Sequence, residues 1–278
     1  ALLVYASAWL KCRYPDAFAA ALLNAQPMGF YAPAQIVRDA REHGVEVRPP
    51  DINHSQWDAT LEQGPRAANH LHELHREMRD DIRTNHAVRL GLREIKGLKE
   101  EDARLIVAMR RHLYDSMRDL WLRTGLSPRV LERLADADAF GSLGLSRREA
   151  LWAAKALGRV GDRDDDLPLF SADSEAALTR IVLREPDVYL PPMPIGEEVI
   201  NDYRFLHLSL RAHPAQFLRS DLNLRTVKQN DTLRSIPSGM WVRISGLVTC
   251  RQRPGSGNRV ILITIEDETA VDNVIVWT

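Results

Sequence analysis

Apolar residues recur at helical spacing through residues 1–50. Pro15 opens a stretch rich in alanine and leucine, and proline is tolerated in the first turn of a helix. Pro33 and Gly44 bracket a second stretch in the order expected for the start and the end of a helix. Three apolar residues of this second stretch share one face: Ile36, Val37 and Ala40. We therefore predict that this part of the chain is helical.

The helical pattern weakens in the next part of the chain. Residues 45–53 alternate between apolar and polar like a short strand, which prolines then stop. Residues 51–85 are polar and rich in histidine. They predict a loop followed by a solvated helix.

Further along, short helical patterns alternate with tight glycine turns. The first such unit is predicted as a helix that includes Val88, a turn of Lys96-Gly97-Leu98-Lys99, and a second helix. Glycine at position 97 permits a backbone conformation that side chains disfavour, and it lets a phosphate come close. Leu98 would fill the gap between the two helices.

A second unit of the same kind follows. Its pattern predicts a helix, a turn around Phe140-Gly141, and a further helix that begins near Ser146. Ser146 and Glu149 have the spacing of a capping box. Two arginines lie in the first turn of this helix: Arg147 and Arg148. Positive charge is unfavourable at a helix N-terminus, so we expect these side chains to face solvent or a phosphate.

Acidic residues and prolines concentrate in residues 161–196, which predicts a linker. Residues 197–218 then predict an amphipathic helix that is broken near Pro214. From Trp241 onward the pattern changes to the alternation of a strand, with four residues on one face: Val242, Ile244, Gly246 and Val248. Two more strands are predicted within residues 259–278.

Three antiparallel strands with unpaired edges are too few for a closed barrel. The last predicted strand stops at Thr278, and the chain begins at Ala1 without methionine, inside a helical pattern. We therefore expect the chain to be a piece of a longer protein, with the remainder of the β-domain beyond residue 278.

The overall composition is that of a globular protein, with 45% hydrophobic and 27% charged residues in 278 positions. Its net charge of -1 gives no global signal for nucleic acid. The local charge is different, because residues 86–160 hold fifteen lysines and arginines against ten acidic residues, which leaves +5. The glycine turns therefore lie in a basic part of the chain.

Cys12 and Cys250 are the only cysteines, and they are far apart in the sequence. This argues against a disulfide framework or a cysteine zinc site and favours a reducing cytosol. The apolar runs are too short to span a bilayer, so no membrane partner is predicted.

A histidine cluster offers the one candidate metal site: His70, His72 and His75. Two of these residues, His72 and His75, share a helical face as metal ligands would. Because no cysteine is near and Glu73 and Glu77 lie beside them, a solvated helix is the preferred interpretation. We predict no metal site and no catalytic residue.

The first turn by itself supports two interpretations. Lys96 and Lys99 flank the backbone N–H groups at the start of a helix, an arrangement that would hold one DNA phosphate without reading sequence. Three acidic residues follow directly and would repel a phosphate: Glu100, Glu101 and Asp102. The alternative is an ordinary connection between helices, capped by its own acids.

Four separated stretches of the chain resemble the bacterial C-family DNA polymerases. In order, they are "YPDAFAAALLNAQPMGFYAPAQIVRDAREHGVEV", "LGLREIKGLKEEDARLIV", "LADADAFGSLGLSRREALWA" and "GLVTCRQRPGSGNRVILITIEDETAVDNVIVWT". The match is closest to the error-prone, translesion type of α subunit and covers nearly the whole chain. One position departs from the pattern, because Lys99 stands where the usual hairpin turn has a second glycine.

The resemblance implies a multidomain α+β protein. It assigns residues 1–85 to the distal fingers with a connecting loop and helix, and residues 86–160 to a tandem helix-hairpin-helix DNA-binding domain. Residues 161–236 would be a linker with a clamp-binding peptide and an amphipathic helix, and residues 237–278 the start of an OB-fold barrel. The polymerase palm, with its Mg²⁺-binding aspartates, would precede residue 1. This segment would need no cofactor and would not polymerise DNA alone.

The resemblance also implies three sets of binding residues. Contacts to duplex DNA are expected from Lys96, Gly97, Leu98, Lys99, Gly141, Ser142, Arg147 and Arg148. Contacts to single-stranded template are expected from Trp241, Arg243, Arg251 and Arg253, with a core tryptophan and surface arginines as the alternative. A sliding-clamp peptide is expected at "DLPLF" through Leu167, Leu169 and Phe170. There Asp166 replaces the usual glutamine, and docking on the chain's own domain is the alternative.

The functional prediction is a C-terminal, DNA-binding segment of an error-prone DNA polymerase that acts in translesion synthesis and repair. Its predicted partners are primer-template DNA, the sliding clamp and translesion accessory proteins, in the bacterial cytoplasm at the nucleoid. The alternative is a non-enzymatic DNA-repair scaffold with hairpin and OB parts.

Overall fold

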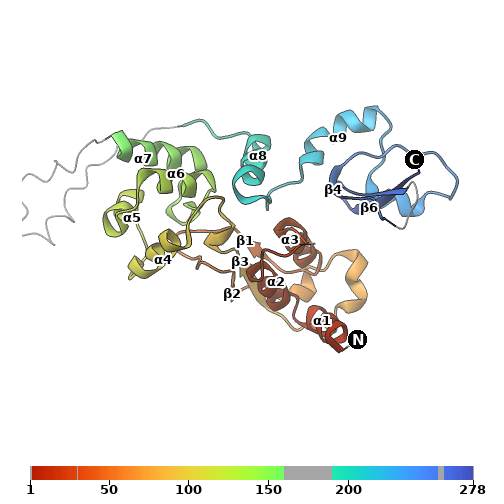
Figure 1. Ribbon diagram of the computed structural model, residues 1–278, viewed down its shortest axis with the longest axis horizontal. Coiled ribbons are helices and arrows are strands. Elements are labelled where there is room, and N and C mark those ends of the chain that lie inside the picture. The colour runs from red at the N-terminus through yellow and green to blue at the C-terminus, as the bar shows by residue number, and fades with distance from the viewer. Residues whose placement is uncertain (1, 30, 160–189, 256–259, 278) are drawn as a thin grey trace, which may run out of the picture. The chain divides into compact units, whose positions relative to one another are not determined.

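The computed structural model describes residues 2–29, 31–159, 190–255 and 260–277. The chain forms two compact units (Figure 1). The first unit comprises Ala1–Met193 with Phe205–Leu208, and the second comprises Pro194–Arg204 with Ser209–Thr278. Helices and small sheets are both present, which confirms the mixed α and β content.

The first unit begins with three helices, α1 (Leu2–Arg13), α2 (Pro15–Asn24) and α3 (Pro33–Glu42). Helices α2 and α3 start at the predicted prolines, and the predicted face of α3 is buried. The proline at the first helical position costs no hydrogen bond, since that N–H has no partner inside a helix. The predicted helical region is confirmed.

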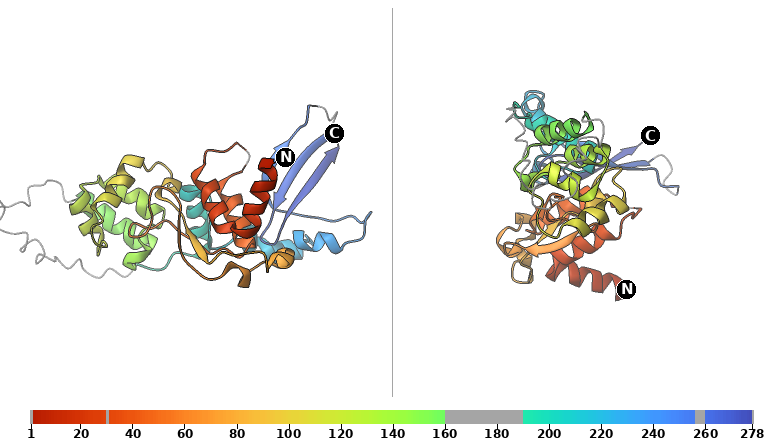
Figure 2. Two further views of the ribbon diagram at one scale, coloured as in Figure 1. Left: turned by 90° about the horizontal axis from the view of Figure 1, so that it is seen from below. Right: turned by 90° about the vertical axis from the view of Figure 1, so that its left-hand side faces the viewer.

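A three-stranded sheet of order β1-β3-β2 follows, made of β1 (Val47–Arg48), β2 (Thr60–Gln63) and β3 (His86–Arg89). The central strand β3 runs parallel to β1 and antiparallel to β2, and Val88 lies opposite both Val47 and Leu61. In the first unit this sheet lies between α1–α3 on one side and the helices that follow it on the other (Figures 1 and 2).

The sheet corrects two sequence predictions. Residues 51–85 were expected to form a loop and one helix, but they contain β2 and two 3₁₀ helices, η1 (Ala67–Asn69) and η2 (Glu73–Met78). The helix predicted around Val88 is wrong, because Val88 is wholly buried in the central strand. The predicted boundary between residues 85 and 86 thus separates two paired strands of one sheet.

The remainder of the first unit is a set of short helices. They are η3 (Leu92–Glu94), α4 (Glu100–Met109), α5 (Met117–Thr124), α6 (Pro128–Asp136), η4 (Gly141–Leu143) and α7 (Arg147–Arg159). Their apolar faces form a common core that includes Ile106, Leu120, Leu131, Phe140 and Ala154, each fully buried. Burial of these side chains supplies the main driving force for folding of this part.

The second unit holds α9 (Pro214–Leu224), η6 (Asn230–Ser235) and an antiparallel sheet. The strands β4 (Leu247–Gln252), β5 (Val260–Glu266) and β6 (Val271–Trp277) pair in sequence order and do not close into a barrel. The first strand starts at Leu247 and not at Trp241, whose side chain is 100% exposed. The alternative of a core tryptophan is therefore wrong.

The predicted amphipathic helix is two helices. The first, α8 (Ile195–Leu206), ends well before Pro214, and α9 begins at that proline. His207 follows α8 with a φ of 61°, a left-handed conformation that cannot continue a helix.

Candidate nucleic-acid interface

The first turn has the predicted glycine geometry. Gly97 adopts a φ of 77°, which side-chain-bearing residues rarely adopt. Leu98 is 7% exposed and belongs to the buried core, but the first of the two helices between which it was predicted to lie is the strand β3. Lys99 is the N-cap of α4 with a φ of -84° and a ψ of 147°. This is ordinary extended backbone, so the lysine fits without strain where a second glycine was expected.

The side chains of Lys96 and Lys99 are exposed on either side of Gly97. Lys96 donates its backbone N–H to the carbonyl of Phe205 at 2.9 Å, which leaves its ammonium as the group available to a ligand. The side chain of Lys99 forms no capping hydrogen bond to α4, and lysine offers no acceptor for one. The first turn therefore offers two ammonium groups beside a helix N-terminus.

The neighbouring acids oppose this positive charge less than their number suggests. Glu100 forms an ion pair with Arg104 one helical turn further on, at 2.6 Å. Burial raises the pKa of the Glu94 carboxyl on the other side of the turn, which disfavours its charged form. Exposed Glu101 and half-buried Asp102 remain at the start of α4, where they suit the helix dipole.

The second turn lies three residues beyond its predicted place. Gly144 adopts the left-handed conformation with a φ of 72°, followed by Leu145 and the helix α7. Gly97 and Gly144 each stand before a leucine, and each is followed six positions on by a fully buried alanine, Ala103 or Ala150. This repeat in the sequence was the signal that the prediction around Gly141 missed.

Ser142, next to Gly141, has a different role from the predicted contact with DNA. The N–H of Ser142 donates to the buried carboxylate of Asp51 at 2.8 Å, so it is not available to a phosphate. The Ser142 hydroxyl accepts from the side-chain amide of Asn53 at 3.0 Å. Ser142 therefore attaches the second hairpin to the loop before β2, and its backbone N–H does not face a ligand.

The capping box at the start of α7 is confirmed. Ser146 donates its N–H to Glu149 at 2.8 Å, and Glu149 donates its N–H to the Ser146 hydroxyl at 3.4 Å. The hydrogen bonds from Ser146 hold the pKa of Glu149 below its ordinary value. The two arginines after this cap differ from the prediction, since Arg147 is 1% exposed and is not a surface group. Arg148 is half-buried and donates to the carbonyl of Pro191 at 2.9 Å.

Several arginines of the basic segment act inside the protein. Arg93 donates to the carbonyls of Asn24 and Gln26, and Arg110 donates to those of Asn53 and Ser55. Burial lowers the pKa of the Arg110 guanidinium. The local charge of +5 therefore overstates the charge that this part presents to solvent.

Arg133 is a further residue of the site, and it was not among the predicted contacts. Its side chain extends from α6 to the first turn and donates from Nη1 to the carbonyl of Gly97 at 2.6 Å. It is exposed, and it adds a guanidinium to the two lysines of the first turn. No local pattern could have found it, because it comes from a helix 36 positions away in the chain.

Four residues were predicted to contact single-stranded template. Arg251 lies within β4 opposite Ile263, and Arg253 follows the end of that strand, whereas Trp241 and Arg243 precede the sheet. All four side chains are exposed. The exposed tryptophan and arginines suit stacking on bases, and their contact with DNA stays a prediction.

The sequence contains two further candidate sites, the predicted clamp-binding peptide and the histidine cluster. The peptide with Leu167, Leu169 and Phe170 lies outside the described residues. Within the ranges that the structure describes, no group of three or more His, Cys, Asp or Glu side chains is arranged to hold a metal ion. His75 stacks on the buried His43 with ring centroids 4.2 Å apart. The described helices include none that is long and apolar enough to cross a membrane.

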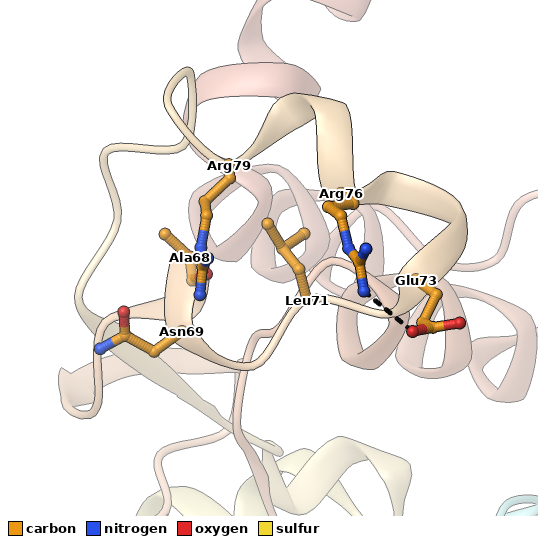
Figure 3. A pocket seen from close by; sticks show the side chains of 6 residues that line it. All are labelled: Ala68, Asn69, Leu71, Glu73, Arg76 and Arg79. Carbon is orange, nitrogen blue, oxygen red and sulfur yellow. Dashed lines mark hydrogen bonds and ion pairs between the residues drawn. The ribbon is translucent and has the colours of Figure 1, made fainter.

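A hollow of about 410 Å³ lies beside the 3₁₀ helix η2 (Figure 3). Of its two arginines, Arg76 is paired with Glu73 at 2.9 Å and Arg79 donates to the carbonyl of Ala68. The described residues that line it include no Ser, Thr, Cys, Lys or His side chain.

Replacing Gly97 by alanine is expected to destabilise the first unit by about 1 kcal/mol, because a side chain is strained at this φ. Gly125 is the matched control, since it ends α5 with a φ of 63° and an added Cβ would meet open space. Thermal unfolding should show a similar destabilisation of the two variants. A stable Gly97→Ala protein would indicate that the turn can change its conformation.

The comparisons with known proteins agree with this geometry. A family model described as "Helix-hairpin-helix motif" matches residues 44–150, which include the sheet as well as both turns. The chain is 58% identical over its full length to error-prone DNA polymerase 1 of Rhizobium meliloti (strain 1021) and to error-prone DNA polymerase of Sinorhizobium medicae (strain WSM419). It is 49% identical to error-prone DNA polymerase 3 of Agrobacterium fabrum (strain C58 / ATCC 33970). In each case the chain spans about a quarter of the relative's length, 24%.

Proposed function

Since the chain is homologous along its full length to a segment of the bacterial error-prone DNA polymerases, we propose that it is the DNA-binding segment of such an enzyme. Its two glycine turns would hold the phosphate backbone of duplex DNA without reading the sequence. The parent enzyme would carry out template-directed nucleotidyl transfer during lesion bypass and repair, in the cytoplasm at the nucleoid. The Mg²⁺ ions and aspartates for that reaction would belong to its palm domain.

One observation carries this proposal. The first turn combines a left-handed glycine, a helix whose N-cap lies two positions further on, and two exposed lysines. Backbone N–H groups at a helix N-terminus and nearby cations bind phosphate by position and charge, and neither distinguishes one base from another. The second turn repeats the left-handed glycine before α7.

Two further contacts belong to the proposal. The exposed Trp241, Arg243, Arg251 and Arg253 would bind single-stranded template at the β4–β6 sheet, as the start of an OB-fold. The helices α1–α3 would belong to the distal fingers, and the peptide at 166–170 would engage the sliding clamp. Pull-down of the sliding clamp by the chain tests the peptide. Replacing Leu169 and Phe170 by alanine is expected to abolish capture of the clamp. Capture that survives this replacement would contradict the proposed contact.

The direct test is reversal of the two lysines. The double variant Lys96→Glu with Lys99→Glu is expected to weaken binding of a labelled duplex, because it places negative charge beside the phosphate. The slope of log affinity against log salt should fall by about 0.9 for each phosphate that the protein no longer neutralises. Fluorescence anisotropy at several salt concentrations measures both quantities.

The matched control is Lys155→Glu with Lys228→Glu, which reverses the same number of exposed lysines outside the turn. We expect duplex binding by this control to keep the salt slope of the unchanged chain. If both double variants bind alike, the first turn is a connection between elements and not a binding site.

A further inference from the structure

We propose that Arg133 completes the phosphate-binding site of the first turn from the second hairpin. This inference rests on the proposed function and adds a further DNA-contacting residue to it. The ligand is one phosphodiester group of the duplex backbone. It would be bound between the guanidinium of Arg133 and the ammonium groups of Lys96 and Lys99.

The helix α6 determines where Arg133 points. Four residues of this helix are buried against the rest of the hairpin domain: Val130, Leu131, Leu134 and Ala135. Arg133 lies outside this buried set, and its side chain is exposed. Packing of α6 therefore holds the arginine at the surface, beside the first turn.

The contact with the turn is close. Nη1 of Arg133 donates to the carbonyl oxygen of Gly97 at 2.6 Å. A Cβ added at Gly97 would lie 3.6 Å from both Cζ and Nε of this arginine, so the guanidinium lies against the bare α-carbon of the turn. A guanidinium has five N–H donors in a planar fork that matches a phosphate, and the Gly97 carbonyl takes one of them.

The charge around this guanidinium is uncompensated. In the part of the chain that the structure describes, no carboxylate lies within 4.0 Å of the side-chain nitrogens of Arg133, Lys96 or Lys99. Arg104, only a few residues along α4, is paired with Glu100. Three unpaired cations at one glycine turn are the arrangement expected for a phosphate.

The second turn has no such group. A Cβ at Gly144 would meet no atom within 4 Å, whereas Gly97 lies beside Arg133. The two turns therefore differ in the cations beside the glycine, and we expect the first turn to bind the duplex backbone more tightly.

The test is the variant Arg133→Gln in the full chain, with the same labelled duplex. Glutamine keeps an N–H donor for the Gly97 carbonyl but removes the charge. We expect affinity to fall about tenfold and the salt slope to be lower by about 0.9. Arg133→Lys should retain the salt slope, since it retains the charge. The thermal midpoint of each variant shows whether the fold is intact, and the lysine variant keeps the test valid if the glutamine variant unfolds.

Arg129→Gln is the matched control, because this exposed arginine lies one turn earlier on α6 and its replacement removes the same charge. If Arg129→Gln and Arg133→Gln lower the duplex affinity and the salt slope equally, the proposed site is overturned, because the attraction would then depend only on net charge. If duplex binding is unchanged in Arg133→Gln but weakened in Lys96→Glu with Lys99→Glu, the role of Arg133 is overturned and the proposed function stands. Absence of duplex binding by the unchanged chain would overturn both.

Discussion

Replacing Asn53 by alanine is expected to lower the free energy of unfolding of the first unit by about 4 kcal/mol. The Asn53 side chain is buried and satisfies both backbone groups of Tyr114, accepting its N–H at 2.7 Å and donating to its carbonyl at 2.9 Å. Alanine would leave these two groups buried without partners, and each such group costs about 1–3 kcal/mol.

This side chain also belongs to a larger polar network. Asn53 donates its N–H to Asp51, whose other carboxylate oxygen accepts from Ser142, and the Ser55 hydroxyl donates to the carbonyl of Leu90. These bonds join the loop before β2 to the end of β3 and to the second hairpin. We therefore expect Asn53→Ala to weaken DNA binding as well, because the two turns would no longer be held in their relative position.

Urea unfolding followed by far-ultraviolet circular dichroism measures the stability change. The neighbouring His54→Ala is the control, because His54 is exposed and its replacement should change stability by less than about 0.5 kcal/mol. A decrease below about 1 kcal/mol for Asn53→Ala would show that water replaces the amide at Tyr114.

The second large effect is expected in the other unit, at Asp267. This carboxylate is 1% exposed and accepts hydrogen bonds from the N–H groups of Asn230, Thr269 and Ala270. It also pairs with Arg219 at 3.1 Å. Asp267→Ala would leave the three N–H groups without this acceptor and would remove a carboxylate partner from the largely buried guanidinium of Arg219. We expect the free energy of unfolding to fall by about 3 kcal/mol.

The same carboxylate predicts a dependence of stability on pH. Burial raises the pKa of Asp267, but the hydrogen bonds from Thr269 and from backbone N–H groups outweigh it, so the pKa lies below its ordinary value of 3.8. The native state then binds fewer protons than the unfolded chain in this range. The stabilisation is fully present above pH 3.8 and is lost as the pH falls through the pKa of the folded state.

Hydrogen exchange of β4, β5 and β6, read by mass spectrometry, measures both effects in the second unit alone. Asp267→Ala should reduce protection of these strands, and protection of α2 and α3 should stay unchanged. Asp231→Asn is the control, since Asp231 lies nearby in η6 with an exposed side chain. Protection of the strands that is equal in the two variants would contradict the role of Asp267.

The sequence predicted those features whose physical cause is local. Proline at a first helical position and an apolar face of period 3.6 determine α2 and α3, whatever packs against them. The turn at Gly97 and the capping box at Ser146 likewise depend on residues within a few positions of one another. The alternation of residues 259–278 was sufficient to predict β5 and β6.

Other features needed contacts between distant parts of the chain. The segment around Val88 is ambiguous by itself, and pairing with Val47 and Leu61 makes it a central strand instead of the predicted helix. Gly141 and Gly144 are three positions apart, and only Gly144 is left-handed, whereas the N–H after Gly141 is bound by the distant carboxylate of Asp51. The family resemblance was confirmed along the chain, but two of the residue-level assignments differ: Arg147 is buried, and the N–H of Ser142 is bound to Asp51.

The amino-acid sequence by itself determined the helices with local caps, the glycine that permits the first turn, and the relationship to error-prone DNA polymerases. The tertiary structure alone decided which cations this turn presents. Arg93 and Arg110 donate to backbone carbonyls inside the protein. Arg133 also donates to a carbonyl, that of Gly97, but its side chain is exposed beside the turn. Charge along a chain is a property of its composition, but charge at a site depends on which side chains packing leaves exposed and unpaired.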